Sequence, residues 1–151
     1  MTIDGPVDPP LTRASEDPAR APVRWAAIVC GIFFLVIGFA GFVPGVTMNF
    51  NGIEMAHRSE AMLLGIFQVS VLHNVIHLLL GLAGLALSRF SHSARRYLLI
   101  GGGISAVLWI FGLLVTPGST TNFLPLNTAD DWAYFAVAIT MIGLSFLPRD
   151  T

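Results

Sequence analysis

The chain has 151 residues, of which 54% are hydrophobic and 11% are charged, and its formal net charge is −1. A water-soluble domain usually carries about twice this share of charge, so the composition argues against an ordinary soluble fold. All eight basic residues are arginines, and no basic patch is large enough to bind nucleic acid.

Residues 1–22 differ from the rest of the chain. This segment is rich in proline and acidic residues and has few large apolar side chains. It cannot bury enough apolar surface to offset the entropy of ordering, so we expect a disordered cytoplasmic tail. Its acidic character and the long apolar run that follows do not match a signal peptide.

Four apolar runs follow the tail, in a predicted transmembrane domain of residues 23–148. A helix that crosses a bilayer needs about 20 mostly apolar residues, and uncharged runs of this length without period-two alternation are typical of helices in lipid. The sequence therefore predicts an all-α polytopic membrane protein with four transmembrane helices, over about residues 25–43, 69–88, 96–115 and 131–147.

The arginines predict the orientation of these spans. Basic residues precede the first span, separate the second from the third and follow the fourth, whereas Arg58 on the opposite side is balanced by Glu54 and Glu60. By the positive-inside rule, both termini and the loop between the second and third spans are expected in the cytoplasm.

The two halves of the domain resemble each other as tandem helical hairpins. RWAAIVCGIFFLVIGFAGFV aligns without a gap over RYLLIGGGISAVLWIFGLLV, and SVLHNVIHLLL aligns over NTADDWAYFAV. The second alignment pairs Ser70 with Asn127, His73 with Asp130, Asn74 with Asp131 and His77 with Tyr134. Two copies that insert the same way round imply a pseudo-twofold axis along the membrane normal.

The capping residues and glycines fit two copies of one helical hairpin. Ser70 and Asn127 are good N-caps before apolar runs, and Asp130 stands where a carboxylate can bond back to the cap. Glycines recur along the spans and indicate close helix–helix contacts, either within the chain or with a partner subunit.

The pattern LLGIF, then HNVIH, then a glycine-spaced apolar helix, then NTADDW resembles the actinobacterial membrane family known as domain of unknown function 4383. The resemblance covers roughly residues 24–148. It implies a four-span protein of the bacterial plasma membrane with no established activity. The second copy departs from the family pattern, in which an asparagine and a histidine are expected after the aspartate; here Asp131 and Tyr134 stand instead.

Candidate site residues gather at the outer ends of the second and fourth spans. His73 and His77 are four residues apart and share one helix face. A structural hydrogen-bond cluster is the leading interpretation, and its sharpest form is a bond from His73 or His77 to Asp130. The cluster comprises Ser70, His73, Asn74, His77, Asn127, Asp130, Asp131 and Tyr134.

The alternative for the same residues is a metal site. His73 and His77 with Asp130 and Asp131 would bind a divalent transition metal near the outer surface. No cofactor is firmly predicted. Haem is not expected, because two histidines on one helix face cannot readily supply opposite axial ligands.

Two further expectations concern the outer segment and the aromatic residues. Met48–Phe67 is long enough for a small amphipathic element, which either anchors at the interface or covers the histidines as a lid. Trp25, Tyr97, Trp132 and Tyr134 fit interfacial belts.

The predicted function is that of a non-enzymatic accessory or scaffold protein. Its expected partners are the lipid bilayer and either further copies of itself or a larger membrane complex. The alternative is a metal- or redox-active membrane protein that uses the histidine and aspartate residues at the outer face.

Overall fold

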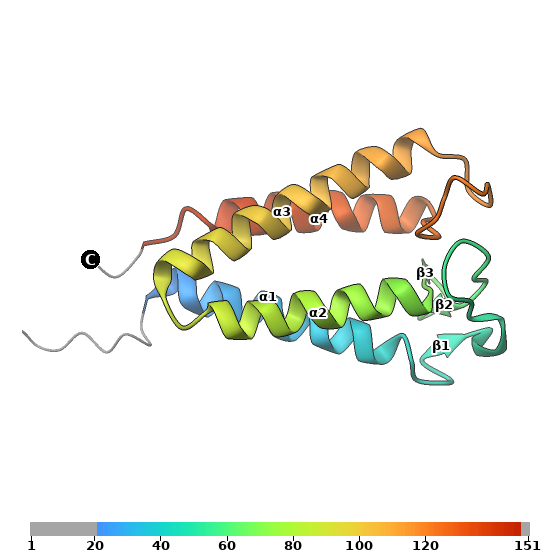
Figure 1. Ribbon diagram of the computed structural model, residues 1–151, viewed down its shortest axis with the longest axis horizontal. Coiled ribbons are helices and arrows are strands. Elements are labelled where there is room, and N and C mark those ends of the chain that lie inside the picture. Colours follow the sequence, from blue (N-terminus) through green and yellow to red (C-terminus); the bar gives the residue numbers. More distant parts are fainter. Residues whose placement is uncertain (1–20, 149–151) are drawn as a thin grey trace, which may run out of the picture.

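The chain is mostly helical, and its helices run up and down one long axis (Figure 1). The computed structural model describes residues 21–148, so the tail predicted over residues 1–22 lies almost wholly outside the described residues. The α-helices in this part of the chain are α1 (Pro22–Ala40), α2 (Val71–Leu87), α3 (Ser91–Leu114) and α4 (Thr128–Leu144).

The connections between helices gather at two opposite ends of the molecule (Figure 1). What we call the terminal end holds the start of α1, the end of α4 and the short link over 88–90. What we call the sheet end holds the segments 41–70 and 115–127.

Local capping explains where the helices begin. Pro22 occupies the first turn of α1, where its fixed φ and missing N–H are tolerated, so this helix begins earlier than predicted. The Ser70 hydroxyl accepts the His73 N–H at 3.1 Å and starts α2. Asn127 and Asp130 form the predicted capping box, and α4 therefore begins at Thr128 rather than near 131.

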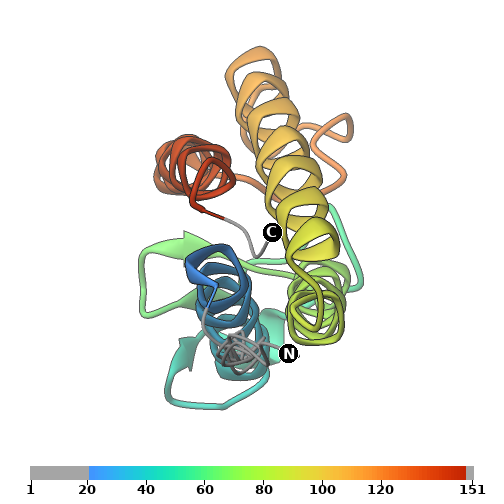
Figure 2. The same ribbon diagram turned by 90° about the vertical axis from the view of Figure 1, so that its left-hand side faces the viewer.

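Glycines bring the helix backbones together in pairs. α1 packs along α2 and α3 packs along α4, with fewer contacts between the pairs, as the end-on view also shows (Figure 2). A Cβ on Gly31 would lie 2.9 Å from the carbonyl oxygen of Gly81, and one on Gly102 would lie 3.1 Å from the Ile142 nitrogen. These glycines therefore serve contacts within the chain.

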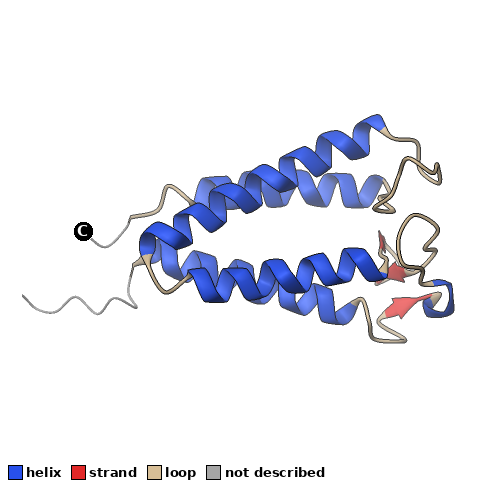
Figure 3. Ribbon diagram, viewed as in Figure 1, coloured by secondary structure: helices blue, strands red, loops and turns tan. Residues whose placement is uncertain are grey.

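A small antiparallel sheet closes the sheet end, where the sequence predicted an amphipathic element (Figure 3). Its strands are β1 (Thr47–Met48), β2 (Met62–Leu63) and β3 (Phe67–Gln68), with the short helix η2 (Phe50–Gly52) after β1. The turn between β2 and β3 places Leu64 and Gly65 at φ 54° and 71°. The fold is mostly helical, as predicted, and the small sheet is an addition that the sequence did not predict.

The helices carry apolar side chains on their outer surfaces as well as between them. α1 and α3 are long and apolar enough to cross a membrane, and α2 is a shorter apolar helix. Outward-facing side chains such as Val36, Phe39, Leu79 and Val107 are each more than half exposed. α4 differs from these apolar helices in that two acidic residues, Asp130 and Asp131, lie in its first turn.

Candidate functional site

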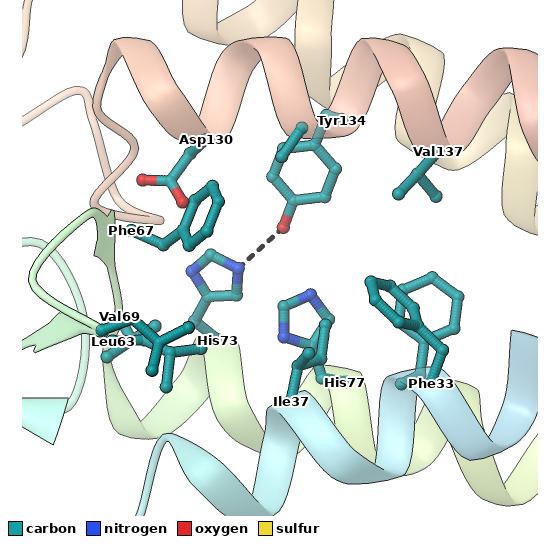
Figure 4. A pocket seen from close by; sticks show the side chains of 13 residues that line it. Phe33, Ile37, Leu63, Phe67, Val69, His73, His77, Asp130, Tyr134 and Val137 are labelled. Atoms are coloured by element: carbon teal, nitrogen blue, oxygen red, sulfur yellow. Dashed lines mark hydrogen bonds between the residues drawn. The ribbon is translucent and has the colours of Figure 1, made fainter. Parts of the chain in front are cut away.

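A cavity of about 300 Å³ lies between α1, α2 and α4, and the turn after β2 covers it at the sheet end (Figure 4). This volume is at the lower end of the range of small-molecule sites, about 300–1,000 Å³. The lining is mostly apolar and consists of Phe33, Phe34, Ile37, Leu63, Leu64, Phe67, Val69, His73, His77, Asp130, Ala133, Tyr134 and Val137.

His73 is the most constrained polar group in the cavity. It lies in the first turn of α2, where the Ser70 cap fixes the backbone, and its side chain is buried. Its Nε2 is 2.8 Å from the hydroxyl oxygen of Tyr134 on α4. Its Nδ1 is buried and has no hydrogen-bond partner within the described residues.

His77 lies one turn further along α2 and packs through its ring. The His77 and His73 ring centroids are 4.6 Å apart, and His77 stacks on Phe34 of α1 with centroids 5.6 Å apart. Over residues 21–148 no hydrogen-bond partner is found for its nitrogens. The ring contacts therefore position His77 and leave its nitrogens available to a ligand.

Asp130 ties the start of α4 to the sheet. Its Oδ2 accepts the backbone N–H of Asn127 at 2.9 Å and that of Gln68 at 3.0 Å. Both donors bond to Oδ2, and neither His73 nor His77 bonds to Asp130. The predicted histidine–Asp130 hydrogen bond is therefore absent from the described residues, and Tyr134 is the partner of His73 instead. The side chain of Tyr134 is buried.

The family of the chain follows from comparison with known proteins. The family model described as Domain of unknown function (DUF4383) matches residues 24–147. The chain belongs to the DUF4383 family. No curated protein and no solved structure matches it.

Four of the eight residues in the predicted hydrogen-bond cluster of this DUF4383 chain do not line the cavity. Ser70 and Asn127 act as caps, and the Asn127 amide also donates to the Ile66 carbonyl at 2.8 Å. Asn74 faces Gly41 after α1, and Asp131 faces Gly112 on α3. His73, His77, Asp130 and Tyr134 are the cluster members that line the cavity.

The proposed metal ligands of the DUF4383 chain are not brought together as one set. Asp131 is turned toward α3, away from the two histidines. Over residues 21–148 no group of three or more His, Cys, Asp or Glu side chains is arranged to hold a metal ion. The two histidines lie side by side on one helix, as the spacing predicted.

Sequence reasoning missed the apolar half of this DUF4383 cavity. Leu63, Leu64 and Phe67 belong to the segment that the sequence predicted either to anchor at the interface or to cover the histidines, whereas Phe33 and Val137 had not been singled out. Phe33 and Val137 belong to uniformly apolar runs, so no local signal separates side chains that face the cavity from those that face outward.

Proposed function

We propose that the chain is a non-enzymatic accessory protein of the bacterial plasma membrane that holds a small lipophilic molecule between two tandem helical hairpins. In this proposal the chain crosses the bilayer four times, and both termini lie in the cytoplasm. The cavity between α1, α2 and α4, with its buried pair of His73 and Tyr134, is the observation that carries the proposal.

The exposed apolar surface supports a membrane location for the bundle. Apolar side chains cover the outside of α1, α2 and α3, which water would disfavour and lipid would accept. Among the described residues, Arg24, Arg89, Arg95 and Arg96 belong to the terminal end. Within the same described residues, Arg58 is the one arginine at the sheet end. This excess of arginines at the terminal end favours its location in the cytoplasm.

Equivalent contacts in the two halves support a pseudo-twofold relationship. Aligned Ser70 and Asn127 both cap helices. Aligned His73 and Asp130 both line the cavity. Aligned Asn74 and Asp131 each lie against a glycine at the neighbouring helix of their own half. Three pairs with matching roles favour duplication over chance similarity between apolar segments.

The proposed accessory role also includes contact with a further protein subunit. Gly103 on α3 and Gly143 on α4 would have nothing within 4 Å of an added Cβ in the described structure. Small residues on an open helix face allow close approach of another helix in lipid. A second copy or a larger membrane complex is therefore the proposed protein partner.

Native mass spectrometry of protein released from lipid nanodiscs tests the binding function. We expect the wild type to retain a lipophilic small molecule that Ala133→Trp excludes, because Ala133 lines the cavity. Ala136→Trp is the matched control, since Ala136 lies one turn away on α4 and is exposed. Equal retention by all three proteins, or no retention by any, would contradict the proposal.

The same preparation tests the metal alternative. Elemental analysis that found a stoichiometric metal, lost in His77→Ala, would favour a metal centre over the binding of a lipophilic molecule.

A further inference from the structure

The lining of the cavity restricts the charge of its ligand. This inference rests on the binding function proposed above and concerns the ligand's chemistry. None of the lining residues is an arginine or a lysine, so a phosphate or carboxylate head would have no fixed positive charge to meet. Burial of an unpaired charge is strongly unfavourable, which excludes anionic head groups.

The hydrogen bond between His73 and Tyr134 determines which proton His73 can offer. Within the described residues, the Tyr134 hydroxyl has one hydrogen-bond partner, the Nε2 of His73 at 2.8 Å. A buried hydroxyl proton is satisfied only when it is donated, so Nε2 accepts it. In a neutral imidazole the other nitrogen, Nδ1, then carries the proton.

This proton has no acceptor within residues 21–148. Nδ1 is buried without a partner, and it lies on the side of the ring away from Tyr134, toward Asp130 and Phe67 (Figure 4). The Oδ2 atom of Asp130 is used by two backbone N–H groups, whereas Oδ1 accepts no hydrogen bond within residues 21–148. The unused donor and the unused acceptor therefore belong to two residues that both line the cavity.

We infer that the cavity binds a neutral lipophilic alcohol whose hydroxyl lies between His73 and Asp130. A hydroxyl accepts one hydrogen bond and donates another, so it satisfies Nδ1–H and Oδ1 together. A carbonyl would satisfy only the histidine, and an ammonium only the carboxylate. The apolar body of the alcohol then packs among Phe33, Ile37 and Val137.

Photolabelling of the full chain in nanodiscs tests this inference. The probes are decanol, decanoate, decyltrimethylammonium and decane derivatives, each with a diazirine in mid-chain. We expect saturable labelling of cavity residues that is tightest for the alcohol and is displaced by excess decanol. His73→Phe should weaken alcohol binding about five- to tenfold more than it weakens decane binding, the effect of one hydrogen bond.

Asp130→Asn and His92→Phe complete the set of variants. Asp130→Asn should lower the preference for alcohol over decane, which keeps the test valid if His73→Phe does not fold. His92 is exposed at the terminal end, so His92→Phe should behave as the wild type.

The outcomes separate the inference from the proposed function. Saturable labelling that is tightest with decanoate or decyltrimethylammonium, or an equal loss of alcohol and decane binding in His73→Phe, would overturn the alcohol assignment alone. Absence of saturable labelling with all four probes would overturn the binding function itself.

Discussion

The side chain of Asn74 fills the space beside Gly41 that a Cβ on this glycine would need. Asn74 is fully buried on α2, and Gly41 ends α1. On α4, Asp131 lies in the same way against Gly112 of α3. In each half, a polar side chain near the start of the second helix rests on the bare backbone near the end of the first.

Gly41→Ala should therefore destabilise the protein by about 1–3 kcal/mol, the usual cost of overpacking. The added methyl group would collide with the amide of Asn74, so this buried side chain would have to shift. Thermal unfolding in a mild detergent measures the effect.

Gly103→Ala is the matched control for this substitution. A Cβ on Gly103 would meet nothing within 4 Å, and alanine favours helix more than glycine does by up to about 1 kcal/mol. We expect an unchanged or raised melting temperature. Equal loss of stability in both variants would refute the role assigned to Asn74.

Tyr134→Phe should lower the free energy of unfolding by about 1–2 kcal/mol. The substitution removes the hydroxyl that bonds to His73 and leaves both nitrogens of that buried ring without a partner. Tyr97→Phe is the control, because the buried Tyr97 hydroxyl has no partner in the described structure and its removal should cost nothing. Chemical or thermal unfolding of both variants under the same conditions measures the two changes in the free energy of unfolding.

Asn127→Ala should cost about 1–2 kcal/mol, since it removes the N-cap of α4. The substitution also removes the bond from the Asn127 amide to the Ile66 carbonyl, which joins α4 to the turn over the cavity. Asn127→Ser separates the two effects because serine retains a capping oxygen and lacks the amide. Recovery of most of the lost stability in Asn127→Ser would assign the effect to the cap.

Much of the helical framework could be predicted from the sequence because it depends on local features. Long apolar runs indicated the helices, and the caps at Ser70 and Asn127 are as predicted. The small sheet could not be predicted, since its strands have two residues each and show no alternation. Leu64 at φ 54° adds to this difficulty, because leucine seldom adopts such a conformation.

The sequence predicted how far along the helices the candidate site lies. It did not predict which side chains of α2 and α4 face each other. Spacing placed His73 and His77 on one face, and their rings are adjacent. Whether Asp130 or Tyr134 meets His73 depends on the rotation of α4 against α2, which no local pattern reports. The bond from the Gln68 N–H to Asp130 and the burial of Tyr134 decide it, and both arise from tertiary packing.

His77→Ala should destabilise the protein by about 2 kcal/mol or more, as expected for a ring removed from a packed site. The substitution removes the stacking on Phe34 and the contact with His73. His92→Ala, at an exposed position, should change stability by less than about 0.5 kcal/mol. Comparable melting temperatures for the two variants would show that His77 contributes little to packing.

Cysteine accessibility tests the orientation proposed for the spans. In a Cys30→Ser background, single cysteines replace His57 and Thr120 at the sheet end and His92 at the terminal end, all three of which are exposed. A membrane-impermeant maleimide should label the first two in intact cells and the third only after permeabilisation, because the arginines favour a cytoplasmic location of the terminal end. Labelling in the reverse order would place the cavity and its histidines at the cytoplasmic face, where they would meet a different pool of ligands.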